Sequence, residues 1–244
     1  MRTWRDVTLG GALVALLFTC SAPLEPAARH YVVFESLQFA LLALVMPALV
    51  VIGAPLARLG AIPGLRVITT RGEQLAAKRL RGSGGAAAVS ALGVYLIALV
   101  FWQIPVVVGW VRASPPLLVV ELFTFATVGT RFWSELVSSP PFRPRVRRMA
   151  RVALAVAPMW TVWVLAYFIG FARSAWFPGF HHSAVVISTL ADQQFATGVL
   201  WTVSAVVFLP VIFANFLRFL SEDEDLSEEL RRLVRRERRA SSGL

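Results

Sequence analysis

The chain has 244 residues, of which 57% are hydrophobic and only 16% are charged. Average soluble domains carry about a quarter charged residues, so this composition and a mean hydropathy of +0.68 exclude an ordinary soluble domain. The net charge of +10 would suit a nucleic-acid-binding protein, but the basic residues lie in connections between apolar runs. No aromatic stacking platform or helix-turn-helix pattern accompanies them. We therefore expect a membrane protein that binds no nucleic acid.

Six largely uncharged apolar runs predict six transmembrane helices, because each is near the twenty residues that a bilayer requires. The runs cover residues 7–24, 31–56, 86–104, 115–133, 152–171 and 195–217. Backbone polar groups in lipid must be paired within their own segment, which only a helix achieves here. The predicted fold class is therefore all-α, a polytopic bundle of six membrane helices. Pro47, Pro158 and Pro210 lie inside runs, where bends are expected.

The basic residues are distributed very unequally between the two predicted membrane faces. Of the 24 lysines and arginines, 21 lie at the N-terminus, in two alternate connections with their flanking helix ends, and in the C-terminal tail. The other connections hold only Arg29, Arg112 and Arg173. Since cytoplasmic loops are enriched in lysine and arginine, both termini are expected in the cytoplasm.

The first run raises the question of a cleaved signal peptide. It has a basic start and small residues at Ser21 and Ala22, as signal peptides do. The run is long for that purpose, and proline follows the most obvious cleavage points, so a retained span is the preferred interpretation. Cys20 is the only cysteine, which leaves no internal disulfide.

Residues 221–244 are predicted as a separate, charged helical tail in the cytoplasm, following a membrane domain of residues 1–220. Ser221 and Glu224 have capping-box spacing. An acidic first half precedes a basic second half, which complements a helix dipole. A solvated helix near the lipid surface is preferred, with a docking helix for a partner as the alternative.

Ionisable groups inside membrane spans are costly and are therefore candidates for function. Few occur here, and the predicted topology places them near the outer ends of four helices. The candidates for an outer polar site are Glu35, Gln103, Glu121, Asp192 and Gln193. A shared site and independent helix ends that meet headgroup water both remain open.

The three histidines are also expected on the outer face. They are His30, His181 and His182, and imidazoles with carboxylates can ligate copper. Adjacent loop histidines are more often exposed, and no cysteine-rich or His-Glu-x-x-His pattern supports a metal site. We therefore expect no cofactor, with copper at these histidines as the alternative. Nucleophile-elbow, phosphate-loop and dinucleotide motifs are absent from the sequence, so an enzyme is not expected.

Four segments in order carry a family resemblance over roughly residues 30 to 218. They are residues 47–56, which end Gly53-Ala54-Pro55-Leu56; Trp102-Gln103-Ile104-Pro105; Gly129 with Phe132-Trp133; and Asp192-Gln193-Gln194 followed by Gly198 and Trp201. Together they resemble the bacterial CtaG-type cytochrome c oxidase assembly factors. The resemblance implies a multi-pass protein of the bacterial inner membrane whose partners are haem-copper oxidase subunits and membrane lipids.

The departures from the family pattern concern copper. The resemblance implies histidines at the outer helix ends, and this sequence has Glu35, Phe39, Gln103 and Leu122 in those places. Phenylalanine and leucine cannot bind a metal. We therefore expect an assembly or accessory factor that acts by binding and has lost copper handling, with substitute histidines as the alternative. The competing class is a small transporter or channel that uses the outer polar residues, although no internal repeat supports it.

Overall fold

The computed structural model describes residues 2–21, 23–59, 66–80, 84–177, 179–180 and 187–241. Within these ranges the protein is built from helices, which confirms the all-α class. They are α1 (Arg2–Thr19), α2 (Leu24–His30), α3 (Val32–Ala40), the π-helical η1 (Leu41–Val45), α4 (Met46–Gly53), α5 (Pro55–Leu59), α6 (Arg66–Leu80), α7 (Gly84–Trp102), α8 (Pro105–Ala113), α9 (Pro115–Thr124), the π-helical η2 (Phe125–Gly129), α10 (Thr130–Leu136), α11 (Arg148–Gly170) and α12 (Thr189–Ser241).

Five helical segments of the described chain are long and apolar enough to cross a membrane. They are Val32–Ala57, Gly84–Trp102, Pro115–Leu136, Arg148–Gly170 and Thr189–Glu222. These confirm the second to sixth predicted spans. The first predicted span is not one straight helix, because Arg5–Thr19 and Leu24–His30 meet at an angle of 52°. The described chain has six candidate spans only if this bent pair is counted as one span.

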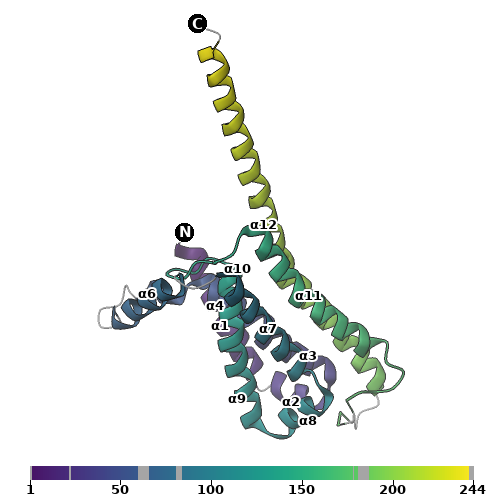
Figure 1. Ribbon diagram of the computed structural model, residues 1–244. Coiled ribbons are helices and arrows are strands. Elements are labelled where there is room, and N and C mark those ends of the chain that lie inside the picture. The colour runs from purple at the N-terminus through teal and green to yellow at the C-terminus, as the bar shows by residue number, and fades with distance from the viewer. Residues whose placement is uncertain are drawn as a thin grey trace.

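The helices form a bundle with two distinct ends (Figure 1). Helices α11 and α12 pack along each other, and α12 also packs against α3. The short helices α2 and α8 lie together at one end of the bundle, beside the lower end of α9, whereas α6 projects from the side near the opposite end (Figure 1). We call the first of these the α2–α8 end. According to the predicted topology it faces outward.

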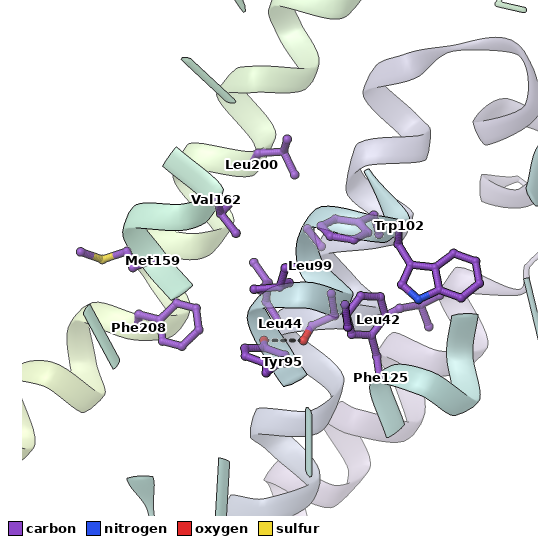
Figure 2. Close-up of a cluster of buried hydrophobic side chains, with 14 of the residues drawn as sticks. Leu42, Leu44, Tyr95, Leu99, Trp102, Phe125, Met159, Val162, Leu200 and Phe208 are labelled. Atoms are coloured by element: carbon purple, nitrogen blue, oxygen red, sulfur yellow. Dashed lines mark hydrogen bonds between the residues drawn. The ribbon is translucent and has the colours of Figure 1, made fainter. Parts of the chain in front are cut away.

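A missing backbone hydrogen bond shapes the second span. Pro47 has no N–H group, so the carbonyl of Ala43, four residues earlier, loses its usual helical partner. The hydroxyl of Tyr95, on α7, donates a hydrogen bond of 2.8 Å to that carbonyl (Figure 2). Tyr95 is fully buried among Leu42, Leu44 and other apolar side chains of the core (Figure 2). A neighbouring helix thus satisfies the group that the proline leaves free, as membrane interiors require.

Two of the segments that carry the family resemblance touch at this point. A Cβ atom added to Gly129 would lie 2.9 Å from Cβ and Cγ of Pro47, so only glycine permits η2 to approach α4 this closely. Phe132 stacks on Tyr95 with ring centroids 4.5 Å apart, and Trp133 stacks on Phe208 at 5.2 Å. These residues therefore join the second, third, fourth and sixth spans.

The tail does not begin a new helix at Ser221, and that part of the sequence-based prediction is wrong. Helix α12 runs without a break from Thr189 to Ser241. The hydroxyl of Ser221 donates to the carbonyl of Leu217, one turn earlier, at 3.1 Å, instead of capping a following turn. No glycine or proline lies between residues 211 and 241 to stop the helix. The division into a membrane domain and a cytoplasmic tail stays a prediction.

Candidate functional site

A small pocket opens at the α2–α8 end, between α2, α3, α8 and α9. Its volume of about 30 Å³ leaves room for a water molecule or a group of similar size. The charged residues that line it are Glu25, Arg29, Glu35, Arg112 and Glu121. The structure thus brings two residues of the predicted outer site, Glu35 and Glu121, to one pocket.

The two predicted carboxylates are poorly compensated. Glu121 is 5% exposed, and its carboxylate has no hydrogen-bond partner among the described residues. Glu35 is partly buried, and the hydroxyl of Ser36 lies 3.4 Å from its Oε2. Gln38 lines the same pocket and uses its Nε2 to donate to the Thr19 carbonyl at 2.9 Å. Its Oε1 remains a free acceptor with respect to the described chain.

The two arginines of the pocket are held in different ways. Arg29 donates from Nε to Glu25 at 2.6 Å, one turn earlier on α2. Arg112 donates from Nη1 to the Arg29 carbonyl at 3.2 Å, and its guanidinium lies 5.0 Å from the ring centroid of Phe180. Its Nε is buried without a hydrogen-bond partner in the part of the chain that the structure describes. Arg112 therefore adds positive charge to the pocket without neutralising a carboxylate there.

Asp192 has a structural position. Its side chain is fully buried, and its Oδ2 and Oδ1 accept hydrogen bonds from the backbone N–H groups of Val32 (2.7 Å) and Val33 (3.1 Å). The first N–H groups of a helix have no partner inside the helix, and a carboxylate there also complements the helix dipole. Asp192, on α12, therefore caps the start of α3 at Val32. Val32 lies three residues before Glu35.

Gln193 is also fully buried and makes two structural hydrogen bonds. Its Nε2 donates to the Ile169 carbonyl at the end of α11, and its Oε1 accepts from the Trp176 N–H, both at 2.7 Å. It ties α12 to the end of α11 and to the connection that follows.

Gln103, immediately after α7, is 4% exposed. Neither its Nε2 nor its Oε1 has a hydrogen-bond partner among the described residues. It does not line the pocket with Glu35 and Glu121. The structure therefore separates the five predicted site residues into a carboxylate pair, two structural residues and one isolated amide.

The structure shows no metal site formed by the histidines within the residues that it describes. His30 is on the surface of α2, with its Nδ1 2.7 Å from the Pro26 carbonyl, and His181 and His182 lie outside the described residues. No group of three or more histidine, cysteine, aspartate or glutamate side chains able to hold a metal occurs in the described ranges. The pocket offers carboxylate and amide oxygens, which suit hard cations, whereas copper(I) prefers sulfur and imidazole. The residues that line the pocket therefore do not fit copper(I).

One polar centre, at the opposite end of the bundle, was not predicted from the sequence. Glu135 of α10 is fully buried and accepts hydrogen bonds from Nη2 of Arg79 at 2.6 Å and from Nε of Arg145 at 3.0 Å. Arg79 also donates to Ser134 at 2.7 Å and lies over the ring of Phe142. The sequence does contain a signal for this centre, because Glu135 is an acidic residue that follows an apolar run and lies between two arginine-rich connections.

The comparisons with known proteins agree with this architecture. A model of the cytochrome c oxidase caa3 assembly factor family (Caa3_CtaG) matches residues 1–222 of the chain. Searches of curated proteins and of solved structures gave no match. The match covers nearly all of the 244 residues, including the five candidate membrane spans found among the described residues. The chain therefore belongs to the cytochrome c oxidase caa3 assembly factor family.

Proposed function

We propose that this protein assists the assembly of a haem-copper cytochrome c oxidase in a bacterial inner membrane by binding oxidase subunits, without carrying copper on its own histidines. Membership of the caa3 assembly factor family supports the oxidase as the target. The observation that carries the rest is the composition of the pocket at the α2–α8 end, which is lined by carboxylates, arginines, one amide and apolar groups. Soft or imidazole ligands for copper are not among its lining residues.

The surface of the α11–α12 hairpin supports binding through helix faces. Most exposed aromatic side chains of the described chain belong to these two helices and their connection. Trp160, Val164 and Phe168 lie one turn apart along α11 and are 55%, 45% and 56% exposed. Large aromatic side chains contribute strongly to packing between elements. This stripe is a suitable face for a transmembrane helix of an oxidase subunit.

The test is a mild-detergent pull-down of the tagged protein, with elemental analysis of the eluate. We expect oxidase subunits to co-purify, and the ratio of copper to oxidase subunits to be the same for the wild type and for a variant with alanine at His30, His181 and His182. The double variant W160A/F168A should lose most of the co-purified subunits. The control is Phe123→Ala, which removes an aromatic side chain of 63% exposure from α9 and should leave the yield unchanged.

Two outcomes would overturn the proposal. Stoichiometric copper that disappears in the His30, His181 and His182 triple alanine variant would show that substitute histidines handle the metal. A protein that purifies alone and moves a solute across liposome membranes would favour the transporter class instead.

A further inference from the structure

We propose that the pocket between α2, α3, α8 and α9 binds the head group of an aminophospholipid, with the primary ammonium at Glu35 and Glu121 and the phosphate at Arg112. This site does not depend on the proposed role in oxidase assembly.

The acceptors in the pocket match an ammonium group. A primary ammonium has three N–H donors and no acceptor. Three side chains with acceptor oxygens that no arginine engages line the pocket, namely Glu35, Glu121 and Gln38, whereas the carboxylate of Glu25 is paired with Arg29. Two of the three, Glu121 and Gln38, are more than nine-tenths buried, with 5% and 8% exposure. The Nε2 of Gln38 is held by the Thr19 carbonyl, so the opposite edge of the amide, Oε1, is the part available to a ligand.

The charges of the pocket call for a cation. Buried charges are costly unless they are paired, and no arginine or lysine side chain of the described residues forms an ion pair with Glu35 or Glu121. Arg29 is engaged by Glu25. An ammonium is close in size to a water molecule, which is what the volume of about 30 Å³ admits.

Arg112 supplies the complementary group for a phosphate. Guanidinium groups bind phosphate oxygens with directed, charge-assisted hydrogen bonds. The Nε donor of Arg112 is buried and unpartnered within the described chain, and the guanidinium packs on Phe180. One pocket therefore presents acceptors and a guanidinium side by side, which fits a ligand that carries both charges better than a bare metal ion. A calcium ion would require six to eight oxygen ligands.

The pocket lies at the level of the lipid head groups along the membrane normal. Glu35 lies three residues after the start of the span Val32–Ala57, and Glu121 six residues after the start of Pro115–Leu136. At 1.5 Å per residue these carboxylates lie roughly 5 and 9 Å along their helices, near the boundary between head groups and acyl chains. Val108, Val111 and Leu118 form an apolar wall of the pocket, on which the upper part of an acyl chain can lie.

The test measures lipid retention by the full chain in detergent, with native mass spectrometry. Phosphatidylethanolamine, phosphatidylcholine and phosphatidylglycerol with identical acyl chains are titrated in turn. We expect one phosphatidylethanolamine to be retained at least tenfold more tightly than the other two, because only its ammonium donates hydrogen bonds. Glu35→Gln and Glu121→Gln should remove this preference, and Arg112→Gln should weaken phosphatidylethanolamine and phosphatidylcholine equally. Glu73→Gln, at an exposed carboxylate of α6, is the matched control and should retain the preference.

Three results would overturn the proposal. Equal retention of the three lipids by the wild type would show that the pocket does not recognise the ammonium. A preference that survives in monodisperse E35Q/E121Q protein would show that these carboxylates do not bind it. Displacement by water-soluble phosphoethanolamine at the same concentration as the lipid would assign the pocket to a soluble amine. A preference abolished by a chelator would assign the carboxylates to a metal ion.

Discussion

The carboxylate of Asp192 lies 2.7 Å from the backbone nitrogen of Val32, a residue 160 positions earlier in the chain. The start of the last span thus holds the start of the second span, next to the pocket that contains Glu35. Asp192→Ala leaves the first N–H groups of α3 without this acceptor, and should cost about 1–3 kcal/mol of stability. Thermal unfolding in detergent measures the effect. Gln194→Ala, at an exposed neighbour, is the control, and an equal loss in both variants would contradict the capping role.

The hydrogen bond from Tyr95 to the Ala43 carbonyl gives a second prediction. Tyr95→Phe retains the ring that stacks on Phe132 but removes the only hydroxyl that satisfies this carbonyl in the described chain. Hydrogen bonds between membrane helices contribute roughly 0.5–2 kcal/mol, and the variant should lose stability in that range. Tyr167→Phe removes a hydroxyl from a half-exposed ring and should have no measurable effect on the unfolding midpoint. A null result for Tyr95→Phe would mean that water or another group replaces the hydroxyl.

The contact between Gly129 and Pro47 predicts opposite responses at two glycines. Gly129→Ala places a methyl group 2.9 Å from the Pro47 ring, and overpacking of this kind costs about 1–3 kcal/mol. A methyl group added to Gly93, on α7, would meet no atom of the other described residues within 4 Å, apart from its chain neighbours and the backbone of its own helix. Gly93→Ala should therefore be neutral or stabilise the helix by up to about 1 kcal/mol. Unfolding of both variants in one detergent provides the comparison. Equal stability of the two would show that the second and fourth spans separate without cost.

The buried carboxylate of Glu135 predicts a large loss. Glu135→Gln leaves two arginines without their shared partner, and breaking a buried ion pair costs about 3–5 kcal/mol. Glu222→Gln breaks the ion pair with Arg148, in which the Glu222 side chain is 57% exposed, and exposed pairs contribute at most about 1 kcal/mol. The ratio of the two losses is the readout. A loss at Glu135 no larger than the loss at Glu222 would contradict a buried, paired carboxylate.

The orientation in the membrane is open to direct labelling. In a Cys20→Ser background, cysteines at Phe34 and Val120, which are 39% and 50% exposed at the α2–α8 end, should react with an impermeant maleimide from the outer side. A cysteine at Leu75 on α6, which is 60% exposed, should react only after the membrane is opened. The reverse pattern would invert the topology that the arginine distribution predicts.

Hydropathy was sufficient to predict five spans, because a membrane span requires about twenty consecutive apolar residues and such a run is visible in the sequence. The first span was not predicted as two helices, because its hydropathy continues through the break between α1 and α2, where Pro23 cannot donate a helical hydrogen bond. The π-helical segments η1 and η2 escaped prediction for a different reason. They arise where Pro47, Gly129 and Tyr95, from three different spans, meet, and no local pattern encodes that meeting.

The polar residues show the same limit. Sequence position was enough to indicate that Glu35 and Glu121 lie near one membrane face, and the structure places them at one pocket. It was not enough to separate them from Asp192 and Gln193, because the partners of those two residues are backbone groups of distant elements. Glu135 was overlooked because an acidic residue at the end of a span resembles an ordinary helix terminus until its two arginines are placed.

The unbroken course of α12 has a mechanical consequence. A helix of 53 residues is about 80 Å long at 1.5 Å per residue, nearly twice the thickness of a bilayer with its head groups. Because the helix does not end at Ser221, a rotation or tilt of its distal turns is transmitted along the same helix toward Thr189, and Pro210 is the position inside it where bending is expected. That end carries Asp192, and through it the first turn of α3 and the wall of the pocket. One continuous helix therefore connects the C-terminal tail to the pocket, and the predicted topology puts these two parts on opposite sides of the membrane.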